Sequence, residues 1–236
     1  AAEVHRRRAG LLLPPSLKAR DEIDGYRIER ELHASHRSHV HLATDLASGD
    51  NVVLKTPSTE LAQDEAALDR FMTEEWIARR LSSANVLEPR HEARTRSRLY
   101  VAMEHVRGQT LAQWMRDHPT PDLETVRSIV EQVARGLQAF HRMEMVHQDL
   151  RPENVMINAG GTVKIIDFGS VHVAGLADVT PAAPAATLGT LSHTAPEVFL
   201  GEGGSERSDQ FSLGVMAYQM LTGRLPYGTR VPGVRS

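Results

Sequence analysis

The run His147–Asn154 and the tripeptide Asp167–Gly169 contain the residues of this 236-residue chain that are best suited to chemistry. Asp149 could receive a proton from a hydroxyl group, while Asn154 and Asp167 are oxygen ligands of the kind that Mg²⁺ prefers. Transfer of a phosphoryl group requires little covalent help, but it requires an aligned nucleophile and cations on the phosphates. The constellation therefore favours phosphoryl transfer from a nucleotide that carries Mg²⁺.

Two cationic side chains could assist such a transfer. Arg151 stands two residues beyond Asp149, where its charge could neutralise the transferring phosphate. Lys55 ends the apolar run Val52–Leu54 and could pair with the α- and β-phosphates of the nucleotide. Only three of the 27 basic residues are lysine, so a lysine at the end of a strand pattern is notable in this chain. We therefore predict a catalytic role for Lys55 and Arg151.

A lysine in this role needs a carboxylate to hold it, and two adjacent glutamates are candidates. The spacing of apolar residues predicts a helix over residues 64–81. Glu74 lies on roughly the same face of that helix as Phe71, which makes Glu74 the predicted partner of Lys55. Glu75 is the alternative.

The remaining pattern has a strand-rich first part and a helix-rich second part, which predicts an α+β fold of two lobes with a cleft between them. Strands are expected at Tyr26–Ile28, Val40–Ala43, Val52–Lys55 and Leu99–Met103, with a hairpin turn over residues 45–50. Helices are expected at 111–116, from a Thr120 cap with Pro121 at the first helical position to Phe140, and at 209–221. Strands at 155–157 and 163–166 would place Asn154 and Asp167 at the ends of one hairpin.

Composition limits the domain organisation and the partners. Residues 1–24 lack sustained periodicity and are interpreted as a linker or tail, and residues 25–236 as the domain, with lobes at about 25–105 and 106–236. The formal charge of −3 gives no reason to expect a nucleic acid or an anionic membrane as partner. Apolar runs are far shorter than the ~20 residues that cross a bilayer. The absence of cysteine excludes disulfides and thiolate metal sites, and a cytoplasmic location is expected.

Twelve histidines raise the possibility of a metal site, because four of them lie between positions 33 and 41. His39 and His41, however, alternate with Val40 and Leu42. This alternation favours the polar face of a strand over a metal site.

Together these motifs closely resemble those of the eukaryotic-type serine/threonine protein kinases, over about residues 26–228. The segment that ends in Lys55 is similar to the family's Val-Ala-Ile-Lys motif, and Glu74 to the glutamate of the family's helix C. Met103–Val106 resembles the gatekeeper and hinge, which implies that Glu104 and Val106 contact the nucleotide. Asp149, Asn154 and Asp167 fall on the catalytic loop and the magnesium-binding motif, and Ala195–Glu197 on the loop that ends the activation segment.

The resemblance implies a small β-rich N-lobe, a helical C-lobe, and transfer of the γ-phosphate of ATP, with Mg²⁺, to serine or threonine hydroxyls of a protein substrate. Thr190 would brace Asp149 and shape the substrate groove, and Asp209 would bind backbone amides of the catalytic loop. More narrowly, residues 147–154 and 205–209 resemble the kinase half of bacterial bifunctional proteins. In those proteins a metal-dependent phosphatase domain precedes the kinase, so a phosphatase domain in a longer parent protein is a possible partner.

Three departures from the family pattern bear on activity. The positions of the phosphate-binding glycines carry His33, Ser35 and Ser38, before Val40, so ATP binding is either tolerated through small side chains or weakened. Gln148 replaces the arginine that reads a phosphorylated activation loop, which disfavours a phosphorylation switch at Thr180 or Thr187. The resemblance stops near residues 227–228, so an incomplete C-lobe is expected.

Two other functions are compatible with some of these residues. A nucleotide-binding pseudokinase or scaffold, with weak or no catalysis, would explain the missing glycines. A small-molecule phosphotransferase of related fold also uses an aspartate followed by an asparagine. The Ala195–Glu197 and Asp167–Gly169 motifs argue against the phosphotransferase.

Overall fold

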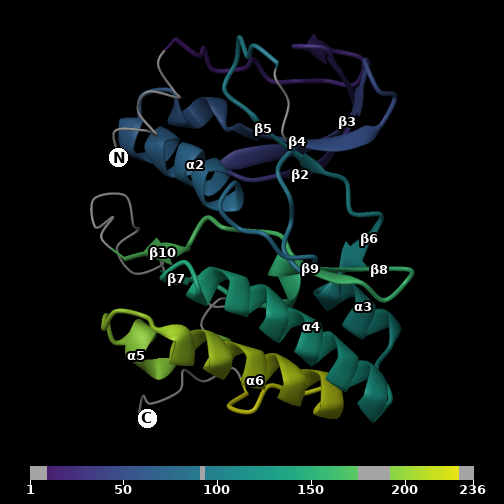
Figure 1. The fold of residues 1–236 in the computed structure, drawn as a ribbon, viewed down its shortest axis with the longest axis vertical. Coiled ribbons are helices and arrows are strands. Elements are labelled where there is room, and N and C mark those ends of the chain that lie inside the picture. Colours follow the sequence, from purple (N-terminus) through teal and green to yellow (C-terminus); the bar gives the residue numbers. More distant parts are fainter. Residues whose placement is uncertain (1–9, 91–93, 175–191, 229–236) are drawn as a thin grey trace. The chain divides into compact units, whose positions relative to one another are not determined.

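The computed structural model of this chain describes residues 10–90, 94–174 and 192–228. The chain forms two compact units, Ala1–Arg80 with Glu88–His105 and Leu81–Leu87 with Val106–Ser236. Strands predominate in the first unit and helices in the second (Figure 1). The α+β class expected from the sequence is confirmed.

A five-stranded antiparallel sheet forms most of the first unit. Its strands follow one another in chain order as β1 (Glu22–Ile23), β2 (Tyr26–Ala34), β3 (Ser38–Asp45), β4 (Asn51–Pro57) and β5 (Val101–Glu104). Because side chains alternate across a strand, β4 buries Val52 and Leu54 on one face and directs Lys55 to the other. In the register of the sheet, Lys55 lies opposite Val40 on one side and Val101 on the other.

The described part of the predicted tail lies against this sheet. Strand β1 pairs with β2, and Leu12 forms a parallel bridge to Arg98. Leu17 is 9% exposed and belongs to the core cluster that contains Tyr26, Leu54 and Tyr100. Leu17 and Ile23 thus contribute to the core of the first unit, although the sequence pattern assigns residues 1–24 to a linker or tail.

His41 corrects the expectation that His39 and His41 form a polar face. The His41 side chain is 2% exposed, and the backbone of Leu17 lies beside it. Burial lowers the pKa of His41, and the nearby Glu31 carboxylate partly opposes this shift. The strand alternation itself is present, but the face that carries His41 also carries the buried Ala43 and Asp45 and therefore points inward.

Helix α2 (Glu65–Ala78) is the main helix of the first unit, and the short 3-10 helix η1 (Thr59–Leu61) precedes it. The carboxylate of Asp64 caps α2 by accepting a hydrogen bond from the backbone N–H of Ala67 at 2.9 Å. The helix buries one apolar face, with Leu68, Phe71, Met72 and Ile77 among the buried residues.

The second unit combines helices with two small sheets. Its helices are α3 (Leu111–Asp117), α4 (Leu123–His141), α5 (Pro196–Phe199) and α6 (Glu206–Thr222). Strands β6 (Gly108–Thr110), β8 (Val155–Asn158) and β9 (Val163–Ile165) form one sheet, and β7 (Met145–Val146) pairs with β10 (His172–Val173). Helices α4 and α6 lie side by side below these strands (Figure 1).

The predicted start of α4 is wrong by two residues. The cap is Asp122 rather than Thr120, because the Asp122 carboxylate accepts hydrogen bonds from the Thr125 backbone N–H at 2.8 Å and the Thr125 hydroxyl at 2.7 Å. A carboxylate at this position also interacts favourably with the helix dipole.

The segment Leu81–Leu87 belongs to the second unit through hydrogen bonds to β9. The Leu87 N–H donates to the Ile165 carbonyl, and the Ile165 N–H donates to the Asn85 carbonyl, at 2.8 and 2.9 Å. Gly136 of α4 permits this arrangement, because a Cβ at residue 136 would lie 2.8 Å from the Asn85 carbonyl oxygen. A glycine in the interior of a helix is therefore explained by the close approach of another backbone.

Within the described ranges, no helix combines the length and the apolar composition needed to span a membrane.

Gly136→Ala should lower the free energy of unfolding of this chain by about 1–3 kcal/mol, because the added methyl group overpacks the contact with Asn85 and Ile165. Gly214→Ala is the matched control, because residue 214 lies inside α6 and a Cβ there meets nothing within 4 Å. The control should instead raise stability by about 0.5–1 kcal/mol. Urea unfolding of both variants measures the difference, and a stabilised Gly136→Ala variant would contradict the packing.

Candidate active site

Asp149 and Asn154 are joined by hydrogen bonds within one loop of the second unit. The Asn154 side-chain amide donates to the Asp149 carbonyl at 2.8 Å and to the Asp149 carboxylate oxygen Oδ2 at 3.0 Å. The 3-10 helix η2 (Pro152–Asn154) sets the distance between the two residues. Because the Asn154 amide nitrogen is used in this way, its side-chain oxygen is the atom that remains for a cation.

The β8–β9 hairpin brings Asp167 near Asn154, in the arrangement that the sequence predicted. The Ile166 N–H donates to the Asn154 carbonyl at 3.0 Å, immediately before Asp167. Asp167 also accepts a hydrogen bond from the Gly169 N–H at 3.0 Å. The two residues offer an amide oxygen and a carboxylate, which fits Mg²⁺, an ion that usually takes one or two protein carboxylates and completes its shell with water and phosphate oxygens.

Asp209 of α6 anchors the loop that carries Asp149, as the sequence predicted. Its carboxylate is fully buried and accepts hydrogen bonds from the backbone N–H groups of His147 and Gln148 at 2.9 and 3.0 Å. His141, the last residue of α4, adds a third contact between its Nε2 and Asp209 at 2.8 Å. This role of His141 is not evident from the sequence, because a histidine at a helix C-terminus is explained by the helix dipole alone.

Asp149 sits in an environment that disfavours its charged form. Burial raises the pKa of the Asp149 carboxyl above its ordinary value, and His147 and Arg151 only partly oppose the shift. Asp167 raises the pKa further by charge repulsion. Arg151 itself donates from Nε to Glu153 at 2.8 Å. A partly buried carboxyl with a raised pKa next to a second carboxylate is typical of a functional site.

Lys55 of the first unit forms an ion pair with Glu74 of α2. Both side chains are largely buried, at 15% and 19% exposure. The alternative partner, Glu75, binds Arg79 and Arg96 instead. The structure therefore pairs Lys55 with the glutamate expected from the helical spacing, while the catalytic roles of Lys55 and Glu74 stay predictions.

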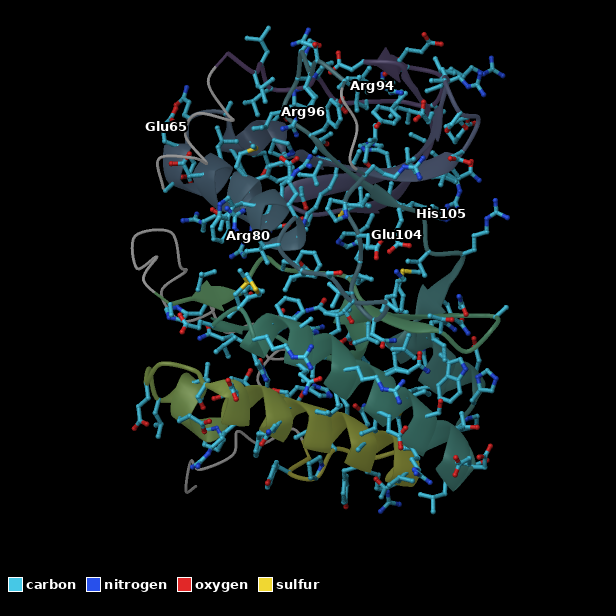
Figure 2. All side chains as sticks on the ribbon, in the orientation of Figure 1. Glu65, Arg80, Arg94, Arg96, Glu104 and His105 are labelled. Atoms are coloured by element: carbon cyan, nitrogen blue, oxygen red, sulfur yellow. The ribbon has the colours of Figure 1, made fainter. Side chains whose placement is uncertain are left out.

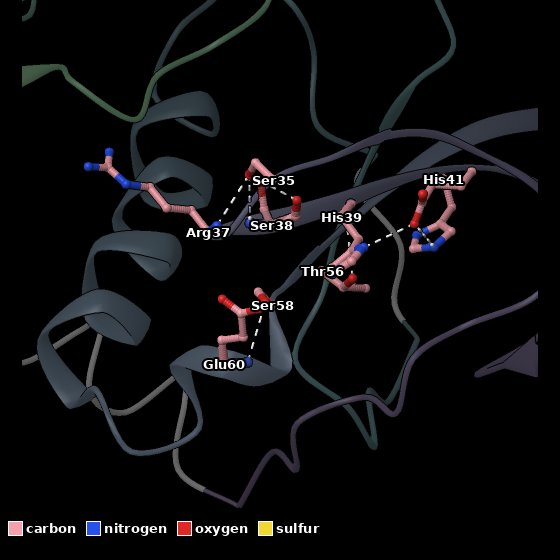
Figure 3. A network of polar contacts seen from close by, with 9 residues as sticks. Ser35, Arg37, Ser38, His39, His41, Thr56, Ser58 and Glu60 are labelled. Carbon is pink, nitrogen blue, oxygen red and sulfur yellow. Dashed lines mark hydrogen bonds and ion pairs between the residues drawn. The ribbon is translucent and has the colours of Figure 1, made fainter. Parts of the chain in front are cut away.

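Ser35 closes the turn in which phosphate-binding glycines were missing. Its hydroxyl oxygen accepts hydrogen bonds from the backbone N–H groups of Arg37 and Ser38, at 3.2 and 3.1 Å, and donates to the Ser38 carbonyl (Figure 3). The Ser58 N–H ties the turn to the end of β4 by donating to the Arg37 carbonyl. Two amides of this turn are thus already satisfied within the protein.

The other predicted nucleotide contacts lie at separate points of the fold. His33 and Val40 face each other in the β2–β3 register. Glu104 ends β5 and accepts a hydrogen bond from the Glu88 N–H at 2.9 Å, and Val106 is buried in the second unit. Thr190, like Thr180 and Thr187, lies outside the described residues.

The Ala195–Glu197 motif forms the start of α5 and is held by α6. Ser208 donates to the Glu197 carboxylate at 2.7 Å, and Ser212 donates to the His193 carbonyl at 2.7 Å. His193 Nε2 lies 3.0 Å from the Gln219 side-chain oxygen, and burial lowers the pKa of His193. These contacts, which the sequence pattern does not indicate, attach the segment to the same helix that carries Asp209.

Comparison with known proteins agrees with this geometry. The family model of the protein kinase domain matches residues 26–232. Serine/threonine-protein kinase PknA of Corynebacterium glutamicum is 31% identical over 207 residues, which cover 86% of this chain and 44% of that protein. PknL of Mycobacterium tuberculosis, also a serine/threonine-protein kinase, is 30% identical over 202 residues, covering 86% and 50%. The probable kinase PknB of Lactococcus lactis is 27% identical, covering 86% and 32%.

This chain therefore spans half or less of the length of these three relatives. The family model covers most of the chain, and PknA is 31% identical over 86% of it. With Asp149, Asn154 and Asp167 arranged as described, the chain belongs to the protein kinase domain family.

Proposed function

We propose that this chain is the catalytic domain of a protein serine/threonine kinase that uses ATP and Mg²⁺. The observation that carries the proposal is the partly buried Asp149 carboxyl, which is hydrogen-bonded to Asn154, has a raised pKa and lies in a loop anchored by Asp209. The relatives named as serine/threonine kinases support the same substrate class.

Each side chain has a stated task in this proposal. Asp149 orients the attacking hydroxyl of the substrate and takes its proton, and Arg151 places a positive charge near the transferring phosphate. Lys55, held by Glu74, binds the α- and β-phosphates. Asn154 and Asp167 hold Mg²⁺, which when bound neutralises charge on the phosphates.

The nucleotide and its surroundings complete the proposal. ATP would contact His33, Ser35, Ser38 and Val40 through its phosphates and sugar, and Glu104 and Val106 through its base. Thr190 would brace Asp149. A protein is the proposed substrate, a phosphatase domain of a longer parent protein is a proposed partner, and the proposed location is the cytoplasm.

Asp149→Asn should lower turnover by a factor on the order of 10²–10⁴, because the amide cannot accept the hydroxyl proton. ATP affinity should stay nearly unchanged, since asparagine can still accept the hydrogen bond from Asn154. Transfer of labelled γ-phosphate from Mg·ATP to the chain itself and to a generic basic protein measures turnover. Asp117→Asn, an exposed change at the end of α3, is the control. Unchanged turnover of Asp149→Asn would show that Asp149 does not accept the proton of the attacking hydroxyl.

The same substitution should raise the melting temperature near pH 7. The folded-state pKa of Asp149 is raised, so ionisation of this carboxyl destabilises the fold, and the penalty grows as pH rises through the window above the ordinary aspartate pKa of about 3.9. The difference between Asp149→Asn and wild type should therefore shrink as pH is lowered toward 4. Asp122→Asn should behave oppositely, because the pKa of the Asp122 carboxyl is lowered and its stabilisation is lost as pH falls. Scanning calorimetry from pH 4 to 8 measures the melting temperatures of both variants and of the wild type. A difference between Asp149→Asn and the wild type that widens toward low pH would contradict the raised pKa of Asp149.

Asp167→Ala should abolish the Mg²⁺ dependence of ATP binding, because it removes the only full carboxylate that we assign to the metal. Calorimetric titration with ATP, with and without Mg²⁺, should give the same affinity for this variant and different affinities for the parent chain. Asp117→Ala should retain the difference. A Mg²⁺-dependent gain in affinity by Asp167→Ala would place the metal elsewhere.

A further inference from the structure

Glu75 is a buried carboxylate to which the proposed chemistry assigns no task. Glu75 is 2% exposed, and the contact with Lys55 is made by its neighbour Glu74 instead. Its oxygen Oε1 accepts hydrogen bonds from Nε and Nη2 of Arg79, at 3.0 and 2.6 Å. Its oxygen Oε2 accepts from Nη1 of Arg96 at 3.0 Å. One buried carboxylate is thus shared between Arg79, which directly follows α2, and Arg96, which is more distant in the sequence.

Arg96 connects this carboxylate to the sheet. The same Nη1 donates to the carbonyl oxygen of Tyr100 at 2.7 Å. Tyr100 directly precedes β5, and its neighbour Val101 lies opposite Lys55 in the β4–β5 register. Arg96 therefore joins α2 to the point of the sheet next to the strand position that carries Lys55.

The two glutamates together restrict the rotation of α2. Consecutive residues on an α-helix point about 100° apart, because a turn contains 3.6 residues. A helix held only by Glu74 could turn about its axis and withdraw that carboxylate. A second contact about 100° away, made by Glu75 to Arg96, opposes that turn. Arg79 cannot supply this restraint, because it lies next to α2 and moves with the helix.

We propose that Glu75 and Arg96 are positioning residues that hold α2 in the orientation in which Glu74 reaches Lys55. The contacts form a closed path from Lys55 through Val101, Tyr100, Arg96, Glu75 and Glu74 back to Lys55. All members belong to the first unit, so the placement of Glu74 is set inside that unit. The consequence for turnover rests on the proposed kinase function, whereas the placement of Glu74 does not.

The test uses the low lysine content of the chain. Only Lys18, Lys55 and Lys164 can react with an acylating reagent at a lysine amine, so mass spectrometry can follow each one separately. The Lys55 side chain is only 15% exposed and its amine is engaged by the Glu74 carboxylate, so a reagent must displace that contact before it reaches the amine. Lys55 should therefore react slowly in the parent chain and faster when Glu74 is displaced, with Lys18 as the internal reference.

Arg96→Gln should raise the acetylation rate of Lys55, relative to Lys18, to about the rate in Glu74→Gln, in which the ion pair is removed directly. Arg96→Lys should restore most of the protection, because an ammonium can still donate to Glu75; the added lysine gives a separate peptide. Glu75→Gln keeps the shape of the side chain and serves as a milder variant if Arg96→Gln does not fold. It too should raise the reactivity of Lys55.

Arg94→Gln is the matched control. Arg94 also makes an ion pair that is largely buried, donating to Asp45 at 2.8 Å and to the Asp24 carbonyl at 3.1 Å. Arg96 lies beside α2, whereas Arg94 extends toward the end of β3 (Figure 2). Arg94→Gln should lower the melting temperature of the chain but leave the reactivity of Lys55 at the parent level.

Two outcomes of the labelling experiment would overturn the inference. One is unchanged Lys55 reactivity in both folded Arg96→Gln and folded Glu75→Gln. The other is an equal rise in Arg94→Gln, which would indicate general loosening of the first unit rather than release of α2.

Turnover provides the second readout. Because small misplacements of catalytic groups are costly, Arg96→Gln should lower kcat/KM by a factor on the order of 10–100, and Arg96→Lys should recover most of it. If the parent chain transfers no phosphate, the proposed function fails while the labelling experiment still decides the role of Arg96. If the parent chain is active and Arg96→Gln is equally active, the positioning role fails while the proposed function stands.

Discussion

A buried carboxylate needs hydrogen-bond donors, and this requirement determines how the segments around Asp209 are arranged in the second unit. An ionised carboxylate removed from water must be paired, and Asp209, which has no exposed surface, collects donors from two separate segments. Two of these donors are consecutive backbone amides, at His147 and Gln148, so the carboxylate determines the path of the chain immediately before Asp149. Gln148 takes the uncommon left-handed conformation, with φ of 64°, at the point where this path turns.

Asp149, which directly follows Gln148, lies in a different environment from that of Asp209. Its carboxyl is partly buried, and among the described residues the neutral side-chain amide of Asn154 is its hydrogen-bond donor. The charged form is consequently disfavoured and the pKa rises. Two aspartates in one unit thus serve different purposes: the one rich in donors holds the backbone, and the one poor in donors is suited to take a proton.

Ser35 and Glu75 extend this reasoning to the first unit. The Ser35 hydroxyl satisfies the amides of a turn that contains no glycine, so the turn keeps its shape without the conformational freedom of that residue. Glu75 resembles Asp209 in that it is buried and gathers donors from more than one segment. In both units, the charged groups nearest the proposed chemistry depend on neighbouring polar groups that contact no reactant.

Local pattern in the sequence was sufficient for strands β2 to β5, β8 and β9 and for the main helices, because these depend on spacing over a few turns or one hairpin. The roles assigned to residues 147–167 rest on the same local spacing and remain predictions. It also identified Glu74, whose position on the helix follows from a period of 3.6 residues. The start of α4 was missed, because two capping residues compete within three positions and only the hydrogen bonds of Asp122 decide between them. The pairing of Glu75 with Arg96, of His141 with Asp209 and of Asn85 with the Val163 carbonyl joins residues 21, 68 and 78 positions apart. The inward face of His41 likewise depends on a segment more than twenty residues earlier. Such contacts leave no periodic signal in the sequence. A buried polar residue is stable only when it has hydrogen-bond partners, and here the tertiary structure supplies those partners from distant parts of the chain.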